Sequence, residues 1–163
     1  MHVNNNAVFS AALQMIGLSE TAQRECADQH KKHMSPLAWA KEFCTIKVCG
    51  PRGCGHTTAA LDLVRYFHGR CVCILPNESM AKRFVKLAIE GKVDFAGMDP
   101  RKACLSIQDK NALCGTSCGI EDLDAVIVDP FSFVSARTLD ENVYVHFMYH
   151  AQRQERFFFI FLE

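Results

Sequence analysis

The sequence predicts an α/β domain with a parallel sheet, preceded by a helical segment. Short apolar and β-branched runs alternate with amphipathic segments of helical length from residue 43 onward. These runs are apolar throughout, which is typical of strands buried on both faces. The 163 residues are the size of one domain. We therefore expect an N-terminal helical extension over residues 1–42 and a P-loop NTPase-like α/β domain over residues 43–163.

The first 40 residues are expected to be mainly helical. Apolar spacing predicts one amphipathic helix over residues 7–16 and a second over residues 19–33, with Ser19 as its N-cap. Pro36 suits the first turn of a third, short helix that continues to Phe43.

The remaining residues read as alternating strands and helices. Strands are expected over residues 43–50, 70–76, 102–108, 123–130 and 156–163. Helices are expected over residues 57–69, 77–91 and 138–155, the second capped by Asn77 or Ser79, and residues 111–119 are expected to form a loop or a short helical turn.

Composition restricts the classes of function. Eighteen basic and eighteen acidic residues cancel, so no overall charge draws the chain to nucleic acid or membrane. No apolar run approaches the ~18 residues of a membrane span, and the first residues lack the basic region of a secretory signal. Nine cysteines, several inside apolar runs, are typical of a reduced, cytoplasmic protein with mostly inert thiols.

A glycine-rich loop, "GPRGCGHTT", follows the first predicted strand and opens a predicted helix. Its spacing fits the phosphate-binding pattern GxxxxGK[ST] except that His56 stands in place of the lysine. Glycines let backbone N–H groups point inward, and the helix N-terminus adds further donors for an anion. The predicted nucleotide-binding residues are Gly50, Pro51, Arg52, Gly53, Cys54, Gly55, His56, Thr57 and Thr58.

This loop resembles the "GPPGTGKTT" loop of superfamily 1 helicases and related P-loop ATPases. The segment "CVCILPNESMAKRFVKL" is similar to the family's next strand, loop and helix, where Pro76, Asn77 and Ser79 would contact single-stranded nucleic acid. The segment "DLDAVIVDPFSF" looks like the Walker B strand. The resemblance implies that Thr57 and Asp129 would position Mg²⁺ for ATP or another nucleotide.

The departures from the family concern the residues that perform hydrolysis. Pro130 stands where these ATPases place a catalytic glutamate, and proline has no side-chain base. The lysine is replaced by His56, and we expect no second helicase domain to supply an arginine finger. A histidine in place of the lysine costs on the order of 1.5–3 kcal/mol of phosphate binding. We expect weak nucleotide binding that improves below pH 7, with little or no hydrolysis; Arg52 is a candidate to supply charge.

Three functions remain open on the sequence alone. The first is a degenerate nucleotide-binding protein of the kind found in phage or other mobile genomes, acting as a regulator or decoy. The second is a protein-interaction module with a relic loop, using the N-terminal helices or the edge of the C-terminal strand. The third is an ATPase or helicase-like subunit that a partner completes and that acts on nucleic acid.

Other side-chain groups are weighed against ordinary structural roles. Cys26, His30 and His33 share one face of a predicted helix and are candidate zinc ligands, and Cys114 and Cys118 are candidates for the remaining positions. The favoured interpretation is an ordinary polar helix face and two small loop residues. A basic strip is favoured as a solvated surface over a nucleic-acid site: Lys82, Arg83, Lys86, Lys92, Arg101 and Lys102. We interpret His68, His146 and His150 as structural or surface groups.

Overall fold

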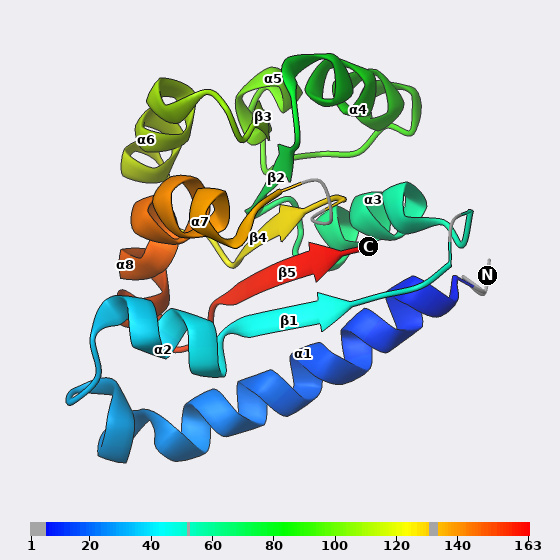
Figure 1. Ribbon diagram of the computed structural model, residues 1–163. Coiled ribbons are helices and arrows are strands. Elements are labelled where there is room, and N and C mark those ends of the chain that lie inside the picture. Colours follow the sequence, from blue (N-terminus) through cyan, green and yellow to red (C-terminus); the bar gives the residue numbers. More distant parts are fainter. Residues whose placement is uncertain (1–5, 52, 131–133) are drawn as a thin grey trace.

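The computed structural model describes residues 6–51, 53–130 and 134–163, and it shows three layers with a parallel sheet in the middle (Figure 1). The strands are β1 (Thr45–Val48), β2 (Cys71–Leu75), β3 (Cys104–Ser106), β4 (Ala125–Val128) and β5 (Phe158–Leu162). Their order across the sheet is β1-β5-β4-β2-β3, and every neighbouring pair is parallel. The predicted α/β class with a parallel sheet is confirmed.

Helices cover both faces of the sheet. One face carries α1 (Ala7–Cys26), α3 (His56–Tyr66) and α4 (Glu78–Glu90). The other carries α2 (Pro36–Phe43), α6 (Lys110–Gly119), α7 (Ala136–Leu139) and α8 (Val145–Arg153). Shorter helical segments are η1 (Ala27–Lys31), α5 (Pro100–Ala103) and η3 (Asp140–Tyr144), of which η1 and η3 are π-helical.

The strand side chains divide between two hydrophobic clusters, one on each face. On β5, Phe158 and Ile160 belong to the cluster beneath α1, α3 and α4, whereas Phe159 and Phe161 belong to the cluster beneath α2 and α8. This alternation buries every residue of β5 and explains why its sequence is apolar without a break.

The N-terminal helices differ from the prediction. A single helix, α1, replaces the two expected over residues 7–16 and 19–33, and Asn6 caps it by accepting hydrogen bonds from the backbone of Val8 and Phe9. Ser19 lies inside this helix and is therefore not an N-cap. Its hydroxyl donates to the carbonyl of Phe43 at 2.6 Å. The short helix from Pro36 to Phe43 is confirmed, with Ser35 as its cap.

Two further predictions need correction. Residues 111–119, expected to form a loop or a short helical turn, belong to a longer helix of ten residues, which Asp109 caps by accepting from Ala112 N. The C-terminal strand offers no sheet edge: β5 pairs with β1 on one side and with β4 on the other. In the described part of the chain, no helix combines the length and apolarity that crossing a membrane requires.

Candidate phosphate-binding site

The glycine-rich loop joins the end of β1 to the start of α3, at the carboxyl edge of the sheet. Gly53 and Gly55 have φ angles of 81° and 88°, a region that favours glycine. The N–H of Cys54 donates to the carbonyl of Pro51, which closes the turn. Arg52 lies outside the described residues. The helix after β1 and the helices after β4 cover opposite faces, so the loop sits at the kind of crevice where α/β sheets bind ligands.

The N-terminus of α3 has no side-chain cap. Gly55 occupies the N-cap position and can offer no side-chain acceptor. The helix dipole and the N–H groups of the first turn therefore favour an anion at this end. By contrast, a side chain caps each helix that follows a loop elsewhere in the described chain: Asn6, Ser35, Asn77, Asp99, Asp109 and Ser135.

Thr57 and Asp129 are in contact at the carboxyl edge of the sheet, although 72 positions separate them in the sequence. The hydroxyl Oγ1 of Thr57 donates to Oδ2 of Asp129 at 3.3 Å. Thr57 lies in the first turn of α3, and Asp129 directly follows β4. The resemblance implied that these two residues act at one Mg²⁺ position, and the structure brings them together.

Asp129 is buried, with 4% of its surface exposed. Burial raises the pKa of its carboxyl above the ordinary value, against the opposing influence of His56 and of the Thr57 hydroxyl. A buried carboxylate is costly unless a cation or hydrogen-bond donors compensate it. A cation at this position would therefore stabilise the folded chain.

His56 contacts the loop that precedes it. Nε2 of its imidazole lies 3.3 Å from the Sγ atom of Cys54, and Nδ1 lies 4.0 Å from it. Gly50 lies next to both groups: a Cβ atom there would be 2.8 Å from Sγ of Cys54 and 3.7 Å from Nε2 of His56. Cys54 and His56 are half-buried, so a soluble ligand can reach them.

Two contacts that hold the loop were not predicted. The side-chain amide of Asn6 donates to the carbonyl of Gly55 at 2.8 Å, so the residue that caps α1 also holds the start of α3. The N–H of Gly50 donates to the carbonyl of Glu163 at 2.7 Å, which joins the loop to the end of β5. An asparagine just before an amphipathic run signals the helix cap. No local pattern indicates its contact 49 positions away.

The zinc candidates do not form a metal site in the structure. Within the described ranges, no group of three or more His, Cys, Asp or Glu side chains is placed to hold a metal ion. Cys26 ends α1, and the following π-helix has a wider turn that changes the angular spacing of Cys26, His30 and His33. His30 instead stacks on Phe43, with ring centroids 6.0 Å apart.

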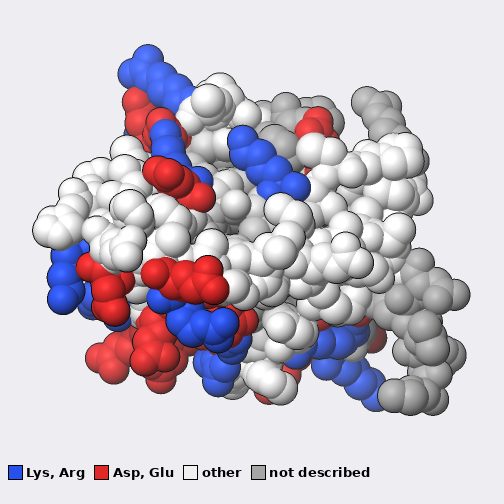
Figure 2. All heavy atoms as spheres, turned by 90° about the horizontal axis from the view of Figure 1, so that it is seen from below, with Lys and Arg blue, Asp and Glu red and all other residues white. Residues whose placement is uncertain are grey.

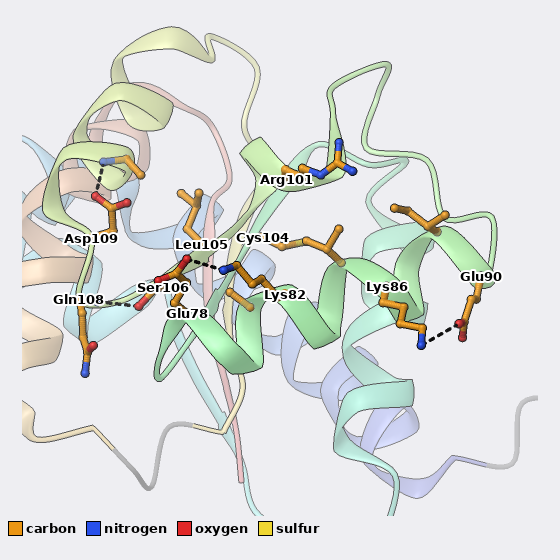
Figure 3. A pocket seen from close by; sticks show the side chains of 14 residues that line it. Glu78, Lys82, Lys86, Glu90, Arg101, Cys104, Leu105, Ser106, Gln108 and Asp109 are labelled. Carbon is orange, nitrogen blue, oxygen red and sulfur yellow. Dashed lines mark hydrogen bonds and ion pairs between the residues drawn. The ribbon is translucent and has the colours of Figure 1, made fainter.

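Members of the basic strip line a groove of about 950 Å³ beside the edge strand β3 (Figure 3). Lys82 pairs with Glu78 at 2.8 Å, Lys86 with Glu90 at 4.0 Å, and Arg101 with Asp99 at 3.9 Å. Acidic partners thus offset the charge on these three basic side chains. The groove lies at the opposite edge of the sheet from β1 and the phosphate loop.

The histidines of α8 have different surroundings. His150 is buried, and its Nε2 pairs with the carbonyl of Ser117 at 2.8 Å, which joins α8 to α6. Burial lowers the pKa of His150 and of the half-buried His146 below the ordinary value. The interpretation of His150 as a structural group therefore suits its surroundings.

Comparisons with protein-family models, with curated proteins and with solved structures find no match to this chain.

Proposed function

We propose that this protein is a degenerate P-loop protein that binds a nucleoside triphosphate with Mg²⁺ at residues 50–58 and hydrolyses it slowly or not at all. The contact between Thr57 and Asp129 is the observation that carries the proposal. A glycine-rich loop alone is a common turn. A loop whose first helical threonine meets a buried aspartate from another strand is the arrangement that a metal–phosphate site needs.

The distance between the two oxygens suits magnesium. Ligands in neighbouring positions of an octahedron at 2.0–2.1 Å from Mg²⁺ are about 2.9 Å apart. Oγ1 of Thr57 and Oδ2 of Asp129 are 3.3 Å apart, so a small shift would let both face one ion, directly or through water. The ion would also compensate the buried carboxylate of Asp129.

Phosphate binding would use the open end of α3 and the turn that Gly53 and Gly55 permit. His56 replaces the lysine that reaches the terminal phosphates in similar loops. Its imidazole contacts Cys54 within the loop, and we propose that it donates to a bound phosphate. Without a permanent charge at this position, we expect weak binding.

Hydrolysis lacks a base next to Asp129. Pro130 occupies the position where similar ATPases carry a glutamate, and it has no group that can accept a proton from water. We therefore expect that the bound triphosphate stays intact over many minutes.

A titration of Mg-ATP and Mg-GTP against the wild type and Asp129→Asn tests the proposal. Asparagine keeps an acceptor for the hydroxyl of Thr57 but removes the charge that attracts Mg²⁺. The variant should therefore melt at the same or a higher temperature without ligand, since it no longer buries a carboxylate. It should also lose the part of the nucleotide affinity that depends on Mg²⁺. Equal Mg²⁺ dependence in both proteins would contradict the site.

A protein-interaction role is the second candidate, because of the surface of α1. No charged residue occurs over residues 7–19, and Met15 and Leu18 are 41% and 67% exposed. Figure 2 views the molecule from below: charged side chains gather mainly at the left, and a broad uncharged area crosses the middle. Met15→Lys with Leu18→Lys should abolish capture of any partner bound there and leave nucleotide binding unchanged.

A further inference from the structure

We propose that the groove beside β3 binds an extended, acidic peptide segment of a partner protein, which joins the sheet as a further parallel strand. The groove has a volume of about 950 Å³ and lies between α4 and the segment that runs from α5 to the start of α6 (Figure 3). It is at the opposite edge of the sheet from the phosphate loop, so this inference does not rest on nucleotide binding.

Strand β3 has a strand partner on one side only, which is β2. The N–H of Ile107 donates to the carbonyl of Leu75 at 2.8 Å, directly after the paired residues. In a parallel ladder, alternate residues turn both of their backbone groups toward the same neighbouring strand. Leu105 therefore faces β2, whereas Cys104 and Ser106 face away from it, and both line the groove.

Two of the four backbone groups on this outer side already have partners. The N–H of Cys104 donates to the carbonyl of Pro100, and the carbonyl of Ser106 accepts from the N–H of Asp109 at 3.1 Å. Among the described residues, the carbonyl of Cys104 and the N–H of Ser106 have no backbone partner.

The two open groups suit a parallel strand. One residue of such a strand, placed opposite Leu105, would donate its N–H to the Cys104 carbonyl and accept from the N–H of Ser106. An antiparallel strand would instead pair with both groups of one residue, and each of these two residues has one group already used. Strand addition of this kind is a common way to bind a peptide.

The walls of the groove suit alternating side chains. Val85 and Ile89 line it from α4, one turn apart, and Ile89 is 53% exposed. Leu105 and Ala112 line it on the side of α6. Successive side chains of a strand point to opposite faces of the sheet, so the residues on either side of the bonded one would point toward α4. We therefore expect apolar residues at these two positions.

The charge of the groove suits an acidic residue in the peptide. The side chains of Lys86 and Arg101 are 78% and 77% exposed, and their ion pairs, at 4.0 and 3.9 Å, are long. Two acidic side chains of the groove are engaged more closely: Glu78 pairs with Lys82 at 2.8 Å, and Asp109 accepts from the first turn of α6 at 3.0 Å. A carboxylate on the peptide would complement the loosely paired cations.

The test selects peptides from a displayed library of random sequences on the full chain. The enriched peptides are then synthesised, and their affinities are measured by fluorescence anisotropy. Ser106→Pro removes the open N–H and should weaken binding at least about tenfold. Proline is tolerated on an edge strand where the N–H faces outward. Ser106→Ala is the matched control, because both variants lose the hydroxyl contact with Gln108 N but alanine keeps the N–H.

Two further measurements separate strand addition from other modes of binding. Ile89→Lys should also weaken binding at least about tenfold, whereas Leu18→Lys, on the exposed surface of α1, should leave it unchanged. N-methylation of the peptide, one residue at a time, should abolish binding at the residue that donates to Cys104. The same change should be tolerated at both neighbouring residues, whose N–H groups point away from β3.

The inference would be overturned if no peptide is enriched, or if the enriched peptides bind Ser106→Pro and Ile89→Lys as tightly as the wild type. Equal losses in Ser106→Pro and Ser106→Ala would overturn it too, as would a single-stranded oligonucleotide that binds at the groove in place of any peptide. Thermal melts show that each variant is folded. A Mg-ATP titration is a separate readout: peptide binding without nucleotide binding would refute the proposed function and leave the groove as a peptide site.

Discussion

Helices α3 and α4 both follow parallel strands and pack on the same face of the sheet, yet they begin in opposite ways. Asn77 caps α4 by accepting a hydrogen bond from the N–H of Met80 at 2.9 Å. Gly55 begins α3 with a φ of 88° and no side-chain cap. A side chain thus satisfies the start of α4, whereas no side chain caps the start of α3, where we propose that an anion binds.

Asn77 and Asn6 both cap helices, but their side chains differ in their other contacts. Asn77 stabilises the start of its own helix, α4. Asn6 also caps a helix, but its amide holds Gly55 in the loop. A substitution at the start of α4 should therefore change only the free energy of unfolding. A substitution at the start of α3 should change ligand binding.

The largest effect is expected from Gly55→Ala. Its positive φ strains an alanine, and the new Cβ would lie 2.7 Å from Nδ2 of Asn6. We expect a loss of roughly 1–3 kcal/mol in the free energy of unfolding and no measurable nucleotide binding. Gly53→Ala is the control, because its φ is also positive but no atom lies within 4 Å of the new Cβ. Urea denaturation and a nucleotide titration of both variants measure these two effects. Equal losses in Gly55→Ala and Gly53→Ala would contradict the role of the contact between Asn6 and Gly55.

His56→Lys should have the next largest effect, in the opposite direction. A permanent charge at the start of α3 should lower the dissociation constant for Mg-ATP by about tenfold to a hundredfold. Hydrolysis should stay negligible, since Pro130 still offers no base. Calorimetric titration gives the affinity and phosphate release gives the rate; unchanged affinity would mean that phosphate does not reach residue 56.

Asn77→Ala should lower the free energy of unfolding by about 1 kcal/mol, the usual contribution of an N-cap. Nucleotide affinity should not change, because α4 starts after a different strand. Asn77→Asp should restore the stability. Weaker nucleotide binding in the alanine variant would show that the two helix starts are not independent.

The smallest effect concerns pH and lies away from both helix starts. Burial lowers the pKa of His150, so the folded state favours the neutral ring. Its contribution to stability is complete above the ordinary histidine pKa of about 6.5 and is lost as the pH falls below it. The melting temperature should fall by a few degrees between pH about 7.5 and 5.5. His150→Gln should reduce this dependence, and an equal fall in that variant would contradict the assignment.

The sequence was most informative where a local pattern determines the structure. Apolar runs indicated all five strands, and Pro36 marked the start of α2. Of the two caps expected for α4, Asn77 or Ser79, the structure has Asn77. Local patterns failed at Ser19, which has a capping side chain but bonds instead to Phe43, 24 positions away. Strand order also depends on long-range packing. The sequence therefore leaves a sheet edge open as a partner site at the C-terminal strand, whereas β5 pairs on both sides.

The site was predictable in its parts but not in its contacts. Glycine spacing indicated the loop, and the resemblance of residues 122–133 to a Walker B strand indicated Asp129. The contact of Cys54 with His56, and that of Asn6 with Gly55, depend on side-chain directions that spacing does not determine.

The most direct test of the central claim is a thermal melt of the wild-type chain with increasing Mg-ATP and Mg-GTP, at pH about 6 and about 8. A ligand that binds only the folded state raises the melting temperature with its concentration. Our account predicts a rise that requires Mg²⁺ and is larger at the lower pH, where histidine more often carries charge. No rise at either pH, up to millimolar nucleotide, would contradict it.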